Sequence, residues 1–460
     1  MKKGILVILL LLFSFAGYAN QCSEYWHKEN YEKAFTSCKK KAKQGDAESQ
    51  YFLAYMYDDG DGTEQDKQKA VYWYTKAAEQ GDFRAQNNLA FMYDNGDGIK
   101  PDKQKAVYWY TKAAEQGNAD AQYFLAYMYY NGDGIEQNKQ KAVYWYTKSA
   151  EQDNVDAQFN LALMYNKGNG IEQDKQKAVY WYTKSAEQDN AKAQFNLALM
   201  YDNGNGIEQD KQKAVYWYTK SAEQGLPDAQ YNLACMYYEG KGTAQDKIKA
   251  AYWFTKVAEQ GDTIAPYNAI AQYNLALMYD NGDVLEQDKQ KAFYWYTKSA
   301  ELGDAEAQYN LACMYDEGDG IEPDKQKAVY WFTKSAAQGH ADAQYNLGNM
   351  YDGGNGIEPD KQKAFYWYTK AAEQGDFKAQ NNLAVMYNYG DGIEQDNQKA
   401  FYLYSKSAQQ GNSVAQYNLA DMYYKGDGIE QNKYLAKKYY QLACDGHHKK
   451  ACSKLKQLTE

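Results

Sequence analysis

Two serine–lysine spacings are the first places in the chain where covalent chemistry could occur. Ser37 and Ser453 each have a lysine three residues later, Lys40 and Lys456. Serine β-lactamases use Ser-x-x-Lys, but they also need Ser-Asp-Asn and Lys-Thr-Gly motifs. Both of these are missing, and the two segments lie at opposite ends of the chain. We therefore expect chance matches in a lysine-rich chain and no catalytic residue.

A second candidate for chemistry is the group Cys444, His447, His448 and Cys452 near the carboxyl end. Thiolates and imidazoles are preferred zinc ligands. The grouping occurs only once, and the two cysteines could form a disulfide instead if the chain is exported. Both alternatives stay open at this point.

The acidic turns, such as Asp94-Asn-Gly-Asp-Gly-Ile99, could be thought to bind calcium. An EF-hand loop needs glycine at its sixth position, and here glycine stands third and fifth and isoleucine sixth. Glycine and aspartate have turn-forming and capping roles in such a segment. The pattern predicts turns, with no metal and no cofactor.

These turns belong to a block, ending in Lys-Gln-Lys-Ala-(Val/Phe)-Tyr-Trp-Tyr-Thr-Lys, that recurs through most of the chain. A glycine in the turn marks each copy, at Gly60, Gly96, Gly132, Gly168, Gly204, Gly240, Gly282, Gly318, Gly354, Gly390 and Gly426. The step is 36 residues every time except once. Self-similarity at such a period predicts an all-α solenoid, in which each unit buries its apolar face against its neighbours. Near-identical units disfavour a single-site enzyme.

One repeat, residues 82–117, predicts two helices. Asp82 is a candidate N-cap, and apolar residues at helical spacing predict a first helix over 83–94 that ends at Gly96. Asp102 is expected to cap a second helix over 103–116. The expected buried stripe of this second helix is Ala106, Trp109, Ala113 and Ala114. Lys103 lies in its first turn, which is unfavourable for the helix dipole unless an acidic loop lies close to it.

The first 19 residues have the pattern of a secretory signal peptide. Lys2 and Lys3 precede an apolar run, and Gly17 and Ala19 are the small residues of a cleavage site. We expect cleavage after Ala19 and a periplasmic or secreted protein that does not span a membrane. The net charge of −10 and the absence of a basic tract disfavour nucleic acid as a partner.

The repeats divide the mature chain into a series of expected segments. These are an N-terminal cap at 20–45, an array at 46–262, an insertion loop at 263–270, a second array at 271–448 and a capping helix at 449–460. The insertion contains Pro266, which disfavours simple continuation of a helix. A surface loop and a hinge between the arrays are the two interpretations.

The two halves of the repeat resemble the Sel1-like repeat, a relative of the tetratricopeptide repeat. The matching patterns are Ala-x-x-x-Leu-Ala-x-Met-Tyr-x-x-Gly-x-Gly and Lys-Ala-x-x-Trp-Tyr-x-Lys-Ala-Ala-x-x-Gly, over residues 46–448. The resemblance implies a right-handed superhelix of antiparallel helix pairs that acts as an adaptor or scaffold. It also implies a disulfide between Cys444 and Cys452, as in cysteine-rich Sel1-like proteins. Cys22 and Cys38 are a plausible second bridge.

The resemblance implies that the first helix of each repeat lines a concave binding face. Two neighbouring columns of that helix could form ladders of amides and phenols, able to hold an extended peptide. The amides are Asn88, Asn160, Asn196, Asn232, Asn274, Asn310, Asn346, Asn382 and Asn418, and the phenols include Tyr231, Tyr273, Tyr309 and Tyr345. Phe52 and Phe124 interrupt the amides. An equally good interpretation is that both ladders only hold the repeats together.

The expected function is an exported scaffold that binds a protein or peptide partner. The alternatives are a weak β-lactam-binding or hydrolysing enzyme, which some cysteine-rich relatives suggest, and a cell-wall glycan binder, because exposed tyrosines can stack on sugars.

Overall fold

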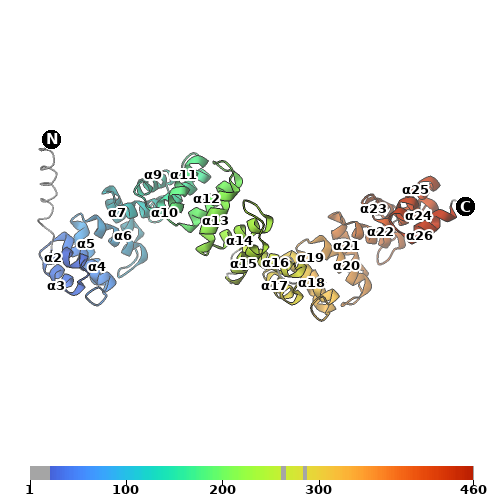
Figure 1. Ribbon diagram of the computed structural model, residues 1–460, viewed down its shortest axis with the longest axis horizontal. Helices are drawn as coiled ribbons and strands as arrows, with labels where there is room; N and C mark the ends of the chain where they lie inside the picture. The colour runs from blue at the N-terminus through green and yellow to red at the C-terminus, as the bar shows by residue number, and fades with distance from the viewer. Residues whose placement is uncertain (1–20, 261–265, 283–286, 459–460) are drawn as a thin grey trace. The chain divides into compact units, whose positions relative to one another are not determined.

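The computed structural model describes residues 21–260, 266–282 and 287–458 (Figure 1). Every regular element within these ranges is an α-helix, and within each unit described below the helices pack on their neighbours in the chain. The all-α solenoid is therefore as predicted. The chain divides into two units, Met1–Ala229 and Gln230–Glu460. The expected signal peptide, residues 1–19, lies outside the described residues.

Each repeat contains a first helix, called helix A, and a second, called helix B. In the first unit, helices A are α4 (Ala47–Asp59), α6 (Phe83–Asn95), α8 (Ala119–Asn131), α10 (Val155–Lys167) and α12 (Ala191–Asn203). Helices B are α5 (Lys67–Glu79), α7 (Lys103–Glu115), α9 (Lys139–Ala150), α11 (Lys175–Glu187) and α13 (Lys211–Glu223). Two short helices, α2 (Gln21–His27) and α3 (Tyr31–Ala42), precede them.

In the second unit, helices A are α14 (Pro227–Glu239), which begins at the unit boundary, α16 (Pro266–Asn281), α18 (Ala305–Glu317), α20 (Ala341–Gly353), α22 (Phe377–Tyr389) and α24 (Ser413–Lys425). Helices B are α15 (Lys247–Glu259), α17 (Lys289–Glu301), α19 (Lys325–Ala337), α21 (Lys361–Glu373), α23 (Asn397–Gln409) and α25 (Lys433–Asp445). The last helix is α26 (Lys449–Gln457).

The predicted helix ends are confirmed. Asp82 accepts the Ala85 N–H at 3.1 Å, and Asp102 accepts the Lys105 N–H at 3.0 Å. Gly96 ends α6 with φ of 81°, a conformation that glycine adopts without a steric penalty. The second turn glycine has another role, because a Cβ on Gly98 would lie 2.6 Å from the backbone of Lys67 in the preceding repeat. This turn therefore packs against the start of the preceding helix B.

The buried stripe of helix B differs from the prediction at one position. Ala106, Ala113 and Ala114 are buried as expected, but Trp109 is only half-buried and Tyr110 is fully buried. The prediction was wrong there because the two aromatic residues are adjacent, and only the packing decides which of them faces the core.

Acidic groups neutralise the lysine at the start of helix B. Lys103 forms an ion pair with Asp94, at the end of α6, at 2.5 Å. Lys67 pairs in the same way with Asp58 at 2.6 Å and also reaches Asp97, in the turn of the next repeat, at 3.5 Å. These contacts offset the unfavourable placement of a cation at a helix N-terminus.

Disulfides close both ends of the array, as the sequence analysis expected. Cys22–Cys38 joins α2 to α3, and Cys444–Cys452 joins α25 to α26. The zinc alternative at the second pair is wrong, because both sulfur atoms are in the disulfide. His448 instead caps α26, accepting the Ala451 N–H through Nδ1 at 3.2 Å.

The insertion is shorter as a loop than predicted. Residues 266–270 form the first turn of α16, which begins at Pro266. Proline is tolerated at the first position of a helix, where its missing N–H would have no intrahelical partner. The expected loop 263–270 is therefore wrong for its second half, and residues 261–265 lie outside the described part of the chain. The unit boundary, at 229–230, does not coincide with the insertion.

Candidate binding groove

The amide and phenol ladders lie side by side on helices A, and each predicted residue is half-buried. This holds for Asn88, Asn160, Asn196, Asn232, Asn274, Asn310, Asn346, Asn382, Asn418, Tyr231, Tyr273, Tyr309 and Tyr345. The side chains are therefore neither core residues nor a fully exposed surface.

Phenols of one repeat interact with amides of the next. Burial raises the pKa of Tyr123, and its side-chain hydrogen bond with Asn160 acts in the opposite direction. Tyr273 with Asn310 shows the same two effects on the tyrosine pKa. The ladders thus join successive repeats.

The amide changes partner where the phenol is absent. Phe159 replaces tyrosine before Asn196, and Asn196 donates instead to the Lys192 carbonyl of its own helix at 2.7 Å. Asn88, in the second repeat, donates to the hydroxyl of Tyr74, in helix B of the first repeat, at 3.0 Å, although Tyr51 stands at the phenol position before it. These bonds occupy one hydrogen-bonding group of each of these amides within the protein. The bond from Asn88 favours the interpretation in which the amides hold the repeats together.

A buried glutamine ladder was missed by the sequence analysis. Gln122 donates to the Ala114 carbonyl at 3.0 Å and accepts from Gln152 at 2.8 Å, so that it connects three helices. Its equivalents are Gln50, Gln86, Gln158, Gln194, Gln230, Gln272, Gln308, Gln344, Gln380 and Gln416, all buried. Strict recurrence of glutamine after alanine at this position was the available signal.

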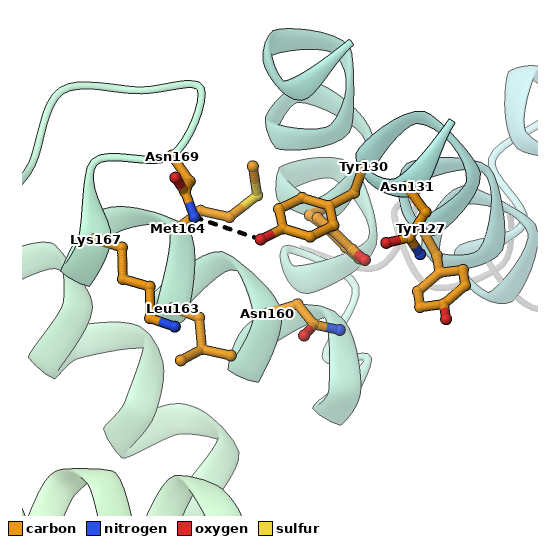
Figure 2. A pocket seen from close by; sticks show the side chains of 9 residues that line it. Tyr127, Tyr130, Asn131, Asn160, Leu163, Met164, Lys167 and Asn169 are labelled. Carbon is orange, nitrogen blue, oxygen red and sulfur yellow. Dashed lines mark hydrogen bonds between the residues drawn. The ribbon is translucent and has the colours of Figure 1, made fainter. Parts of the chain in front are cut away.

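A pocket opens between α8 and α10, with a volume of about 150 Å³ (Figure 2). Its lining comprises Tyr127, Tyr130, Asn131, Tyr146, Asn160, Leu163, Met164, Lys167 and Asn169. Asn169 donates to the Tyr130 hydroxyl at 3.4 Å, which closes one side. A predicted ladder residue, Asn160, therefore lies in a cavity of side-chain size.

The second unit has an equivalent pocket between α14 and α16, with a volume of about 300 Å³. Its lining comprises Tyr231, Cys235, Tyr238, Glu239, Phe254, Asn274, Leu277 and Met278, and all of these except Tyr231 stand at positions that also line the first pocket. Two predicted residues, Tyr231 and Asn274, are among them. Cys235 stands where the first pocket has Tyr127, and the smaller side chain leaves more space.

The gap between α6 and α8 is filled by Phe124. Its ring stacks on Tyr110 at a centroid distance of 5.2 Å and contacts Phe91 at 6.3 Å. Phe52 has a different explanation, because it packs on Trp26 of α2 at 5.6 Å and so belongs to the N-terminal cap. We call the surface formed by successive helices A within one unit, with its open and filled gaps, the helix A groove of that unit.

The two free cysteines, Cys235 and Cys313, are half-buried on helices A of the second unit. Burial raises the pKa of the Cys313 thiol to about 11 and also raises that of Cys235. Thiols with raised pKa values are protonated at neutral pH and weakly reactive. Cys235 and Cys313 therefore act as small groove-lining residues.

The described residues contain no metal-binding cluster. Groups of three or more histidine, cysteine or acidic side chains that could hold a metal are absent from this part of the chain. Ser37 and Ser453 lie in α3 and α26, in different units, and Ser453 donates to the Lys449 carbonyl at 3.2 Å. Within the described ranges, no helix combines the length and the apolar character needed to cross a bilayer.

Comparison with known proteins identifies the repeat. The Sel1 repeat profile matches residues 47–82, 83–118, 119–154, 155–190, 191–226, 227–262, 269–304, 305–340, 341–376, 377–412 and 413–448. No match is found among curated proteins.

Solved structures include close relatives. The chain is similar to c5321, described as a protective antigen present in uropathogenic Escherichia coli strains with an SLR fold, at 37% identity, a TM-score of 0.82, and coverage of 92% of this chain and 90% of that chain. A Sel1 repeat protein from Oxalobacter formigenes is 35% identical, with a TM-score of 0.49 and coverage of 53% and 100%. The eleven profile matches span most of the sequence, and the chain belongs to the Sel1 repeat family.

Proposed function

We propose that this protein is an exported scaffold that binds extended segments of a protein partner along the helix A groove. Sel1 repeats generally mediate protein interactions, and the matched family is a repeat family, not an enzyme family. The observation that carries the proposal is the open pocket between α8 and α10, where amide, phenol and apolar groups converge. Peptide-binding sites combine such apolar space with a few polar groups that fix orientation.

Export is part of this proposal. The apolar leader at residues 1–19 and the disulfides Cys22–Cys38 and Cys444–Cys452 support a periplasmic or secreted location, because disulfides persist in oxidising compartments. The similar Escherichia coli protein is described as a protective antigen, which supports a location outside the cytoplasm.

Site-specific photocrosslinking tests which face binds. A photoreactive phenylalanine analogue replaces Tyr127, which is 47% exposed on the groove, or Tyr144, which is 54% exposed on helix B of the same repeat. After expression in cells, mass spectrometry identifies the crosslinked proteins. We expect a specific partner at position 127 and none at position 144. Crosslinks at 144 alone, or at neither position, would contradict binding in the groove.

A glycan-binding role is the second candidate, because tyrosines recur on the exposed side of helix B. Tyr108, Tyr144, Tyr180 and Tyr216 are each more than half exposed and rest edge-on against the next tryptophan, with centroids 4.9 Å apart. Aromatic faces of this kind can stack on sugars. Sedimentation with purified peptidoglycan, compared between the native chain and a variant with these four tyrosines changed to serine, separates this function from the first.

A further inference from the structure

The pocket between α8 and α10 is formed partly by positions that vary among the repeats. Most columns of the array are copied, so they cannot distinguish one gap from another. The position of Tyr127 does vary, and its equivalents are Tyr55, Phe91, Leu163, Leu199, Cys235, Leu277, Cys313, Asn349, Val385 and Asp421. The position of Lys167 varies as well, and its equivalents include Asn131, Glu239, Tyr389 and Lys425. Selectivity for a ligand must come from such positions.

Size at the pocket follows the first of these positions. Tyr127 narrows the pocket to about 150 Å³, whereas Cys235 leaves about 300 Å³ in the equivalent pocket. The smaller volume suits one aliphatic side chain. Leu163, Met164 and the ring of Tyr146 supply apolar walls.

Charge at the pocket follows the second position. Lys167 makes no ion pair with any carboxylate in the described part of the chain. By contrast, Lys425, at the same position in the last full repeat, pairs with Asp421 at 3.6 Å. In the pocket of the second unit, Asn281 stands at the position of Lys167, and Glu239, at the position of Asn131, pairs with Lys241 at 2.6 Å. The pocket between α8 and α10 thus has an ammonium group available to an external anion.

Neighbouring amides complete the polar rim. Asn131 and Asn160 lie on opposite helices of the pocket, and Figure 2 shows Leu163 and Lys167 on α10 facing the tyrosines of α8. Amides can pair with a peptide backbone through both a donor and an acceptor. An extended chain can therefore cross the gap with one side chain inserted.

We infer that this pocket selects an acidic peptide segment, with an aliphatic side chain in the slot and an aspartate or glutamate beside Lys167. The inference rests on the proposed function and adds the chemistry of the ligand. Complementary charge at a partly exposed site gives selectivity and a modest gain in affinity.

The test uses the full chain and an immobilised array of random ten-residue peptides. We expect the retained peptides to be enriched in an aliphatic residue near an acidic one. For a retained peptide, glutamine in place of its acidic residue should weaken binding about two- to fivefold. Lys167→Glu should weaken binding of the acidic peptide by a similar factor and shift selection away from acidic peptides.

Matched variants come from the chain itself. Tyr123→Asn with Asn160→Phe copies the natural pair Asn87 and Phe124 of the preceding gap, and should close the pocket while the helices stay folded. Lys425→Glu is the charge control, because Lys425 already has a carboxylate partner. It should leave peptide selection unchanged.

The outcomes separate the inference from the proposed function. Retained peptides that lose binding in the double variant but keep it in Lys167→Glu would overturn the acidic selectivity and leave groove binding in place. If retained peptides bind both variants as well as the native chain, the inference that this pocket binds the peptide is wrong. An array with no retained peptide would count against groove binding of peptides as a whole, and therefore against both. Circular dichroism confirms that each variant is folded.

Discussion

Two adjacent gaps in the first unit, between α6 and α8 and between α8 and α10, have different side chains at the same position of helix A. Phe124 fills the first gap by stacking on Tyr110, whereas Asn160 leaves the second open above Tyr146. The surrounding frame is the same, since Gln86 and Gln122 make equivalent hydrogen bonds. Phenylalanine at this position therefore extends the core into the first gap, whereas asparagine at the same position lines a pocket in the second.

The largest expected effect comes from removing the aromatic floor of each gap. Tyr110→Ala and Tyr146→Ala should each destabilise their repeat by about 3–5 kcal/mol, the usual cost of truncating a buried aromatic side chain. Each ring also loses an aromatic contact worth about 0.5–1.5 kcal/mol, Tyr110 with Phe124 at 5.2 Å and Tyr146 with Tyr123 at 5.9 Å. We expect the larger loss at Tyr110, because its ring is stacked and closer to its partner. Hydrogen exchange measured by mass spectrometry reports the local opening free energy. Equal losses would show that Phe124 adds no more stability than Tyr123 does.

The next prediction tests whether the glutamine hydrogen bonds contribute equally to stability beside the two gaps. Gln86→Ala and Gln122→Ala should each cost about 1–3 kcal/mol, because a buried carbonyl and the next glutamine lose their partner. Chemical denaturation compares the two variants. We expect equal losses of stability. A clear difference would mean that the glutamine hydrogen bonds, and not only Phe124, differ between the two gaps.

A natural break in the glutamine ladder extends the comparison to the second unit. Gln272 Oε1 is buried without a hydrogen-bond partner among the described residues, because Leu302 stands where every other repeat except the last has glutamine. Leu302→Gln should therefore stabilise the protein by about 0.5–1.5 kcal/mol. A rise in melting temperature checks this expectation. As a control, Gln338→Leu should break the intact bond to Gln308 and lower the melting temperature.

The smallest expected change in stability comes from removing single tyrosine hydroxyl groups, one with a hydrogen-bond partner and one without. Tyr74 accepts a hydrogen bond from Asn88, so Tyr74→Phe should cost about 1 kcal/mol. The buried Tyr110 hydroxyl has no hydrogen-bond partner among the described residues, since Phe124 replaces the amide. Tyr110→Phe should then be neutral or slightly stabilising, and its denaturation midpoint would show any loss. A loss equal to that of Tyr74→Phe would indicate an unseen partner, such as water.

Much of the fold was predictable because local signals repeat. Asp82, Gly96 and Asp102 defined helix ends that the structure confirms, since caps act through bonds within a few residues. The choice between Trp109 and Tyr110 for the core was not predictable, because adjacent residues on a helix differ only in the neighbour they face. Asn160 was a candidate from the sequence, but the pocket beside it was not predictable. Only the structure shows that the gap at Asn160 is open, while Phe124 fills the gap before it.

The amino-acid sequence alone determined the repeat, the helix pairs and the disulfide candidates, because period, capping and cysteine placement are properties of the chain itself. Only the tertiary structure decided which of the repeated positions pack between neighbouring repeats and which line open pockets. Those roles depend on contacts between residues about 30 to 37 positions apart, such as Gln122 with Gln152 and Tyr123 with Asn160. Only the packed helices bring such residues together.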